Sequence, residues 1–101
     1  MTLIIYVNTI THMQIDFDPV KDASNTAKHG VSLARAGQFE WDTLVSKPDT
    51  RRDYDELRMI GYAFVGARLY CVVFADRAGV RRIISLRKAN DREVDLYAKD
   101  N

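Results

Sequence analysis

Three consecutive runs of β-branched and aromatic residues, joined by very short connections, constrain the fold more than any other feature of the chain. The runs are LRMIGYAFV (57–65), RLYCVVFAD (68–76) and VRRIISLR (80–87). The connections, GA and RAG, have the length and the glycine content of β-hairpin loops. The middle run is apolar throughout, as expected for a central strand that is at least partly covered on both faces. The sequence therefore predicts an antiparallel meander.

Strand and helix signals precede this meander. QIDF (14–17) alternates between polar and apolar residues and predicts a short first strand. Asp18 followed by Pro19 is a typical helix start, with an N-cap and proline in the first helical position. Gly30 is the expected C-terminal glycine. We therefore expect a helix that begins at Pro19 and ends near His29.

A second helix and a further strand are expected before the meander. Ser32 is a candidate N-cap for a helix over LARAGQFEW (33–41), although this segment contains the helix-disfavouring Gly37. TLVSK (43–47) is a candidate strand. The polar segment that follows it, 48–56, predicts a loop.

The chain ends in another predicted helix. Asn90 and Glu93 have the spacing of a capping box, and DREVDLYAKD (91–100) places Val94 and Tyr97 on one face. The predicted order is therefore β-α-α-β-β-β-β-α. We expect an α+β domain with a four- to five-stranded antiparallel sheet and helices on one face.

Residues 1–12 fit this plan less well. Met13 begins MQIDFDP, which looks like a more natural start of the chain than Met1. Residues 1–12 are therefore interpreted as an N-terminal extension. TLIIYV (2–7) nevertheless has the composition of an edge strand. Residues 13–101 are expected to form one domain, because 101 residues suffice for one core and not for two.

Composition excludes several classes of protein. The single cysteine, Cys71, rules out a disulfide framework and a cysteine zinc site, and its apolar neighbours predict a buried thiol in a reducing compartment. No apolar run has the ~20 residues that a membrane helix needs. The N-terminus has no basic region of the signal-peptide kind. These features predict a cytoplasmic protein without a membrane partner.

Positive charge is concentrated near the C-terminus, although the formal net charge is only +1. Residues 77–92 contain one acidic residue, Asp91, and six basic ones: Arg77, Arg81, Arg82, Arg87, Lys88 and Arg92. Such a distribution is an electrostatic signature of anion or nucleic-acid binding. The alternative is an ordinary solvated surface that happens to be rich in arginine.

Strict alternation along 80–87 divides these basic residues between the two faces of the strand. Arg81 and Arg87 fall on the less apolar face, where their planar guanidinium groups suit phosphate oxygens. Arg82 falls with Ile84 on the core side, unless a β-bulge shifts it. The alternative is that Arg81 and Arg87 pair with acids on the surface, such as Asp53, Asp55 or Glu56.

Other candidate residues have plain structural explanations. His29 at a helix end is more typical of a capping or packing residue than of a catalyst, and Lys28 of a solvated cation. Trp41 and Tyr97 fit core positions, with the Tyr97 hydroxyl at the rim. No serine or cysteine nucleophile motif, metal-ligand cluster or cofactor motif stands out. From the residues alone, we predict an arginine-lined, anion-binding face.

The motifs taken together resemble those of the BrnT-type toxins of bacterial type II toxin–antitoxin systems. The resemblance covers roughly residues 13–98 and is carried by FDPVKDASNTAKHGVS, FEWD, ELRMIG and RIISLRKANDREVDLY in this order. Each motif alone is weak, and their order and spacing are more specific. The departures are Leu86 where the family tends to have Ala, DELR where GEER is common, and the extension before Met13.

This resemblance implies a fold similar to the RelE group and a ribonuclease that arrests growth. It also implies a cognate DNA-binding antitoxin that neutralises the toxin and connects it with operator DNA. Members of the wider group generally work without a metal or other cofactor, promoting attack of the RNA 2′-hydroxyl on the neighbouring phosphate. Such a reaction needs fixed cations and a group that moves a proton.

We carry these expectations onto individual residues. Arg82 and Arg87 would hold the scissile phosphate, His29 or Tyr97 would transfer protons, and Arg58 would reach the same face. The predicted catalytic residues are His29, Arg58, Arg82, Arg87 and Tyr97, and the predicted RNA-binding residues are Lys28, Arg81 and Lys88. Two alternatives stay open: a non-catalytic nucleic-acid-binding or co-repressor module, and a basic protein that docks on an acidic partner.

Overall fold

The computed structural model describes residues 13–100. Its elements are β1 (Ile15–Asp16), α2 (Pro19–His29), the 3₁₀ helix η1 (Leu33–Gln38), β2 (Glu40–Pro48), β3 (Met59–Val65), β4 (Arg68–Arg77), β5 (Val80–Lys88) and α3 (Asp91–Asp100). They form an α+β fold whose order is compatible with the predicted one. The predicted strand at 2–7 and the expected boundary after residue 12 lie outside the described residues.

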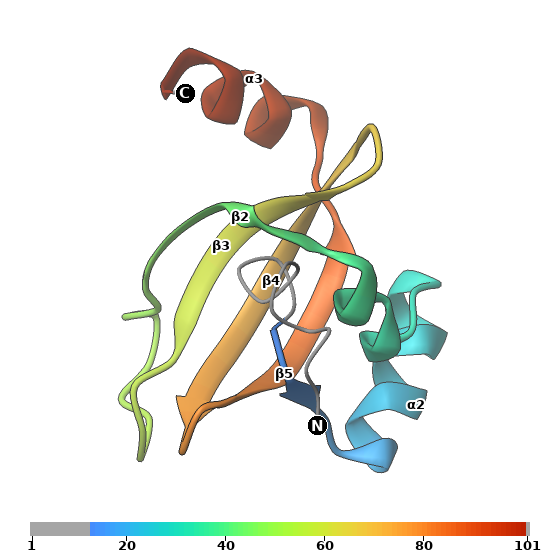
Figure 1. Cartoon of the computed structure of the whole chain (residues 1–101), viewed down its shortest axis with the longest axis vertical. Coiled ribbons are helices and arrows are strands. Elements are labelled where there is room, and N and C mark those ends of the chain that lie inside the picture. Colours follow the sequence, from blue (N-terminus) through green and yellow to red (C-terminus); the bar gives the residue numbers. More distant parts are fainter. Residues whose placement is uncertain (1–12, 101) are drawn as a thin grey trace, which may run out of the picture.

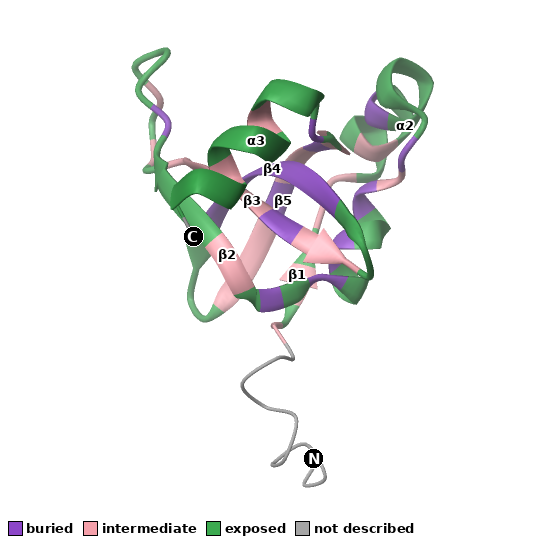
Figure 2. Ribbon diagram, turned by 90° about the horizontal axis from the view of Figure 1, so that it is seen from above, coloured by how far each residue is buried: buried purple, intermediate pink, exposed green. Residues whose placement is uncertain are grey.

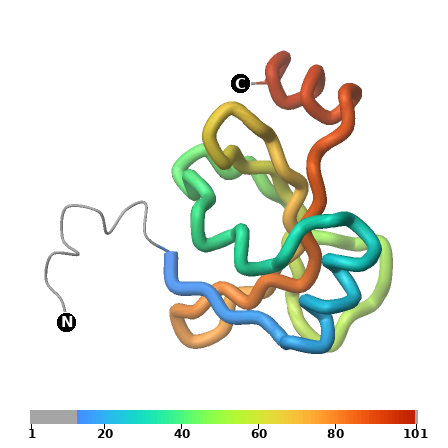
Figure 3. Tube along the Cα trace, turned by 90° about the vertical axis from the view of Figure 1, so that its right-hand side faces the viewer, coloured from blue at the N-terminus to red at the C-terminus, as the bar shows by residue number. Residues whose placement is uncertain are grey.

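A five-stranded, mostly antiparallel sheet forms the centre of the fold (Figure 1). Its strand order is β1-β5-β4-β3-β2. Among the described strands, only the short β1 pairs in parallel; it lies beside β5, as the blue and orange segments of Figure 3 show. The loop between β4 and β5 has two consecutive positive φ angles, 50° at Ala78 and 83° at Gly79. This is the backbone of a type I′ hairpin turn, whose twist matches that of antiparallel strands. The predicted meander is confirmed.

Helix α2 has the predicted limits. The Asp18 side chain accepts a hydrogen bond from the backbone N–H of Val20 at 2.8 Å, and Gly30 ends the helix in the left-handed region at φ 72°. The buried amide of Asn25 attaches this helix to the sheet. It donates to the carbonyls of Val31 and Leu86, both at 2.8 Å, and accepts from the N–H of Leu86 at 3.1 Å.

The predicted second helix over 33–41 is wrong in its type and its end. The segment is a 3₁₀ helix that stops at Gln38, and Phe39 and Trp41 lead into and along β2. Leu33 and Ala36, both fully buried, are three residues apart, which matches the 3₁₀ repeat. Phe39 and Trp41 are buried at the two-residue spacing of an extended chain, so tertiary packing decides the conformation here.

The expectation that all helices cover one face is also wrong. α2 and η1 pack on one face of the sheet and enclose the core with β3, β4 and β5. α3 lies across one end of the opposite face, where the rings of Phe64 and Tyr97 meet edge to face at 5.4 Å. Figure 2 shows that α3 is largely exposed on its outer side. The core consists of Val31, Leu33, Ala36, Phe39, Trp41, Ala63, Tyr70, Val72, Phe74, Ile83 and Leu86.

A β-bulge in β5 overturns the predicted alternation of its side chains. The register shifts between Val73 and Phe74, which pair with Ser85 and Ile83 and leave Ile84 as the extra residue. Arg81 therefore lies on the core face with Ile83. Arg82 and Arg87 lie together on the opposite face, which we call the α3 face; it also carries Tyr62, Cys71 and Ala75.

Loss of the Asn25 amide should destabilise the fold strongly. Asn25→Leu removes three hydrogen bonds and leaves the N–H and the carbonyl of Leu86 without their side-chain partner, and each such buried group costs about 1–3 kcal/mol. We expect a loss of about 3 kcal/mol or more in the free energy of unfolding, measured by urea denaturation. Ser24→Ala, on the exposed side of the same helix, is the control. A loss below about 0.5 kcal/mol for Asn25→Leu would contradict this role.

Candidate active site

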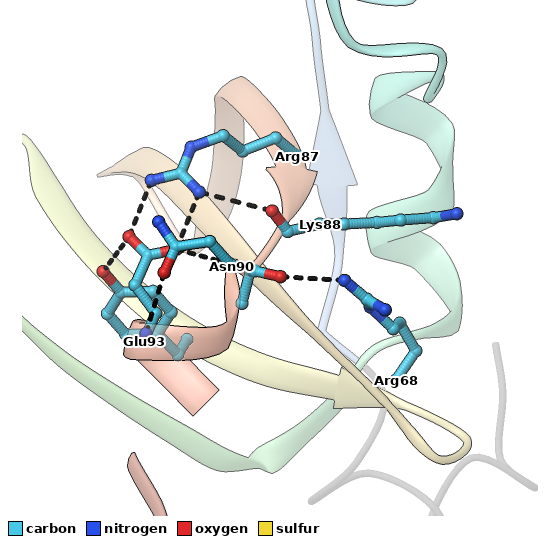
Figure 4. Close-up of polar contacts among 7 residues, drawn as sticks. Arg68, Arg87, Lys88, Asn90 and Glu93 are labelled. Atoms are coloured by element: carbon cyan, nitrogen blue, oxygen red, sulfur yellow. Dashed lines mark hydrogen bonds and ion pairs between the residues drawn. The ribbon is translucent and has the colours of Figure 1, made fainter. Parts of the chain in front are cut away.

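Arg87 lies at the end of β5, where the strand leads into α3, and its guanidinium binds the carboxylate of Glu93 (Figure 4). Nη1 and Nη2 donate to the two carboxylate oxygens of Glu93, each at 2.8 Å. Nη1 also donates to the carbonyl of Lys88 at 3.3 Å. This fork-to-fork pairing is the strongest geometry available to an arginine and a carboxylate.

Glu93 is held from a second side by its own helix. Its carboxylate accepts from the backbone N–H of Asn90, and the Asn90 side chain accepts from the N–H of Glu93, both at 2.9 Å. The predicted capping box is thus confirmed. The carboxylate also lies in the first turn of α3, where the helix dipole favours negative charge.

Tyr62, on β3, binds the same carboxylate from the sheet. Its hydroxyl donates to Glu93 Oε2 at 2.9 Å. In the register of the sheet, Tyr62 on β3 lies opposite Cys71 on β4, and Cys71 lies opposite Arg87 on β5. The phenol and the guanidinium therefore face α3 from positions at the same level of the sheet. We call Tyr62, Arg87, Asn90 and Glu93 the Arg87 cluster.

The contacts of the Arg87 cluster shift its proton affinities. The hydrogen bonds from Arg87 lower the pKa of Glu93 to about 2. Burial, reinforced by the hydrogen bond to Glu93, raises the pKa of Tyr62 above its usual range. The pKa of Cys71 is raised as well, because the thiol is buried beneath the cluster. At neutral pH the cluster therefore contains an ionised carboxylate, a guanidinium and a protonated phenol.

Arg87 keeps donors that the cluster does not use. Within the described residues, its Nε–H and one hydrogen of Nη2 have no hydrogen-bond partner. Its side chain is 36% exposed. An incoming anion can therefore make its first contact with the guanidinium before Glu93 releases it.

A second group of arginines lies further along the α3 face. Arg82 pairs with Ala75, and Arg77 grips the carboxylate of Glu56 with Nε and Nη2. Arg58 directly precedes β3, and its guanidinium stacks over the Tyr54 ring at 4.2 Å. A hollow of about 230 Å³ has Arg58, Arg77, Arg82 and Glu56 in its lining. We call these four residues the Arg82 cluster.

The two clusters share a face but do not meet. Cys71, opposite Arg87, and Ala75, opposite Arg82, are four residues apart on β4, which corresponds to roughly 13 Å along the strand. Glu93 holds the guanidinium of Arg87 at the α3 end. The structure therefore does not bring Arg82 and Arg87 together at one position, as binding of a single phosphate by both residues would require.

Four of the predicted residues lie elsewhere. Lys28 and His29 are exposed at the end of α2, on the other side of the sheet. Lys88 points away from Arg87 (Figure 4). Arg81 stacks over the Phe74 ring at 4.2 Å and pairs with Asp76 at 2.7 Å, so it covers the edge of the core.

The alternative of acid-paired arginines is partly correct. Arg81 and Arg87 both pair with carboxylates, but the acids are Asp76 and Glu93. Among the acids considered at the sequence level, Glu56 instead binds Arg77. Each observed choice follows from strand register and from the position of α3, which alternation alone does not encode.

Tyr97 shares the α3 face with the Arg87 cluster. It lies four residues after Glu93, on the same side of the helix. Its hydroxyl donates to the carbonyl of Thr43 at 2.6 Å, which attaches α3 to β2. A groove of about 430 Å³ runs beside it, and its lining includes Val45, Tyr62, Glu93 and Leu96.

The site residues predicted from the sequence omit five members of the two clusters: Tyr62, Asn90, Glu93, Glu56 and Arg77. Glu93 was recognised as a cap and not as the partner of Arg87. For Tyr62 the sequence offers one indication. Alternation along MIGYAFV places Tyr62 on the same strand face as Phe64, two residues further on. Glu56 was considered only as a neutralising acid, since nothing in the loop sequence indicates which arginine it meets.

Two further observations concern the described part of the chain. Residues 13–100 contain no group of three or more His, Cys, Asp or Glu side chains placed to hold a metal ion. Among the helices described, none has the length and apolar character needed to cross a membrane.

The charge of Glu93 should make stability depend on pH. Its pKa is about 2 in the folded chain against an ordinary value of 4.5, so its contribution is complete above about pH 4.5 and is lost as the pH falls toward 2. Glu93→Gln keeps a capping side chain without the charge. We expect its free energy of unfolding to be about 2 kcal/mol lower than that of the wild type at pH 7, and the difference to be much smaller near pH 2.

Urea denaturation at several pH values measures this difference. Glu40→Gln, at the exposed start of β2, is the matched control and should show no comparable deficit. A deficit for Glu93→Gln that stays constant from pH 7 to pH 2 would mean that the ion pair with Arg87 does not stabilise the fold.

Comparison with known families identifies the chain. No curated protein matched it. A family model described as "Ribonuclease toxin, BrnT, of type II toxin-antitoxin system" matches residues 17–93, which extend from Phe17, just before α2, to Glu93 and include both clusters. The match confirms the resemblance carried by the sequence motifs. The chain therefore belongs to the BrnT family of ribonuclease toxins of type II toxin–antitoxin systems.

Proposed function

We propose that this chain is a metal-independent endoribonuclease that cleaves RNA on the α3 face of its sheet. The observation that carries the proposal is the Arg87 cluster, in which a guanidinium and a phenol both donate hydrogen bonds to one carboxylate. These are the groups that phosphoryl transfer needs when the substrate supplies its own nucleophile. Membership of a ribonuclease toxin family supports the same assignment.

The reaction assigned to this cluster is attack of the RNA 2′-hydroxyl on the adjacent phosphate. The P–O bond to the new ring oxygen forms and the P–O bond to the 5′-oxygen breaks, so one proton leaves the 2′-hydroxyl and one reaches the 5′-oxygen. Arg87 would stabilise the extra negative charge on the phosphoryl oxygens of the transition state, for which its unused N–H groups are available.

Glu93 is our candidate for the proton acceptor. In the free chain it is a weak base, because Arg87 lowers its pKa to about 2. When a phosphate draws Arg87 away, the pKa of Glu93 should rise toward its ordinary value, and the carboxylate becomes a better base. Substrate binding and activation of the base are then coupled through one guanidinium.

The proton donor is assigned to Tyr62, which stays protonated because its pKa is raised. Of the two groups considered for proton transfer from the sequence, His29 lies across the sheet from Arg87. Tyr97 shares the face, and its hydrogen bond to Thr43 supports a role in positioning α3.

The biological part of the proposal follows from the family. A ribonuclease toxin of a type II system has an antitoxin partner and acts on RNA. We propose that a DNA-binding antitoxin neutralises this chain by covering the α3 face, that operator DNA is contacted only through that complex, and that the free toxin arrests growth in the cytoplasm. The arginines of the α3 face favour an antitoxin segment that carries acidic residues.

A non-catalytic RNA-binding module is the second candidate. The observation that favours it is the ion pair itself, since an Arg87 that only attaches α3 to the sheet would have the same contacts. Incubation with labelled RNA in EDTA separates the two. Cleavage supports the enzyme, whereas intact RNA with a salt-sensitive mobility shift supports the module.

Replacement of Arg87 should abolish most of the activity. Arg87→Ala removes the cation assigned to the reacting phosphate, and loss of one such group typically lowers the rate by about 10²–10³-fold. The measurement is the cleavage rate of labelled RNA in EDTA, with the fold checked by circular dichroism. Arg35→Ala, an exposed arginine on η1, is the matched control and should cleave normally. Full activity of Arg87→Ala would remove Arg87 from the site.

A further inference from the structure

The Arg82 cluster has the features of an anion site that the chain fills with its own carboxylate. Arg77 binds both oxygens of Glu56. The charges of Arg58 and Arg82 also act on this carboxylate, and the pKa of Glu56 is lowered, first by its hydrogen bonds with Arg77. Three guanidinium groups from three segments of the chain thus surround one carboxylate.

Two of these guanidinium groups each have one nitrogen without a hydrogen-bond partner in the described part of the chain. The Nε atoms of Arg58 and Arg82 are shielded from solvent and have no hydrogen-bond partner within the described residues. The nearest carboxylate to Arg82 is that of Asp16, at 3.6 Å, which is beyond hydrogen-bond distance. Partly desolvated cations of this kind gain more from an added anion than fully hydrated ones do.

The sheet brings these arginines together over one small residue. Ala75 pairs with Arg82 on one side. On the other side, Met59 pairs with Phe74, so continuation of that register places Arg58 beside Ala75. Ala75, between these two arginines, is only 1% exposed. The small side chain leaves room for both guanidinium groups to converge.

We propose that Arg58, Arg77 and Arg82 form a second phosphate-binding subsite, which Glu56 occupies until an RNA strand displaces it. The subsite lies on the same face as Arg87 but roughly 13 Å further along β4, so it takes a different phosphate of the strand. It positions RNA and takes no part in bond breaking. The identification of the strand as RNA rests on the proposed function, whereas the affinity for phosphate does not.

The subsite is tested with a short 2′-O-methyl oligoribonucleotide, which carries the phosphates of RNA but has no 2′-hydroxyl to attack them. Glu56→Gln removes the competing carboxylate and should tighten binding several-fold. Arg82→Gln removes one cation and should weaken binding on the order of tenfold. For Arg82→Gln, the slope of the logarithm of affinity against the logarithm of salt concentration should decrease by about 0.7.

Matched variants separate the subsite from general charge effects. Glu40→Gln and Arg35→Gln make the same chemical changes away from the subsite and should leave the affinity within about twofold at physiological salt. A gain in affinity for Glu56→Gln cannot arise from loss of folding. Equal affinities for the wild type, Glu56→Gln and Arg82→Gln would overturn the proposal, as would a wild type that does not bind the oligonucleotide.

Cleavage of ordinary RNA by the same proteins distinguishes the two proposals. If the wild type leaves RNA intact while Glu56→Gln and Arg82→Gln change binding as expected, the subsite stands and the proposed nuclease fails. If the wild type cleaves RNA while neither variant changes binding, the nuclease stands and the subsite fails.

Discussion

The candidate site depends on one carboxylate. Glu93 caps its own helix through Asn90, receives the guanidinium of Arg87 from β5, and accepts the hydroxyl of Tyr62 from β3. These contacts anchor α3 at the sheet end where the candidate groups lie. The same contacts help to set the protonation states of the cluster, because they lower the pKa of Glu93 to about 2 and add to the burial that raises the pKa of Tyr62. Stability and the proposed chemistry therefore depend on the same group.

The bulge at Ile84 determines which cations share the α3 face. Without it, Arg82 would point into the core and Arg81 would accompany Arg87. With it, Arg81 covers the edge of the core against Phe74, and Arg82 joins Arg87 on the α3 face. One extra residue in β5 thus creates a face with two separate groups of arginines. A strand of RNA that contacts both groups would meet them with different phosphates.

The sequence predicts the features that depend on neighbouring residues. The limits of α2, the two hairpins and the capping box at Asn90 all follow from local signals, and the structure confirms them. It does not predict the face of Arg81, because a bulge reverses alternation without a distinctive residue. It also misses the link between Tyr62 and Glu93, since the two are far apart in the sequence and meet only when α3 crosses the sheet.

The most direct test of the coupling between Arg87 and Glu93 is the pKa of the Glu93 carboxyl, measured by NMR with and without an uncleavable 2′-O-methyl RNA. In the free chain the value should be about 2. With RNA bound, Arg87 turns toward a phosphate, and the pKa of Glu93 should move toward the ordinary carboxyl value. A pKa that stays near 2 while RNA is bound would contradict a reaction centred on Arg87 and Glu93.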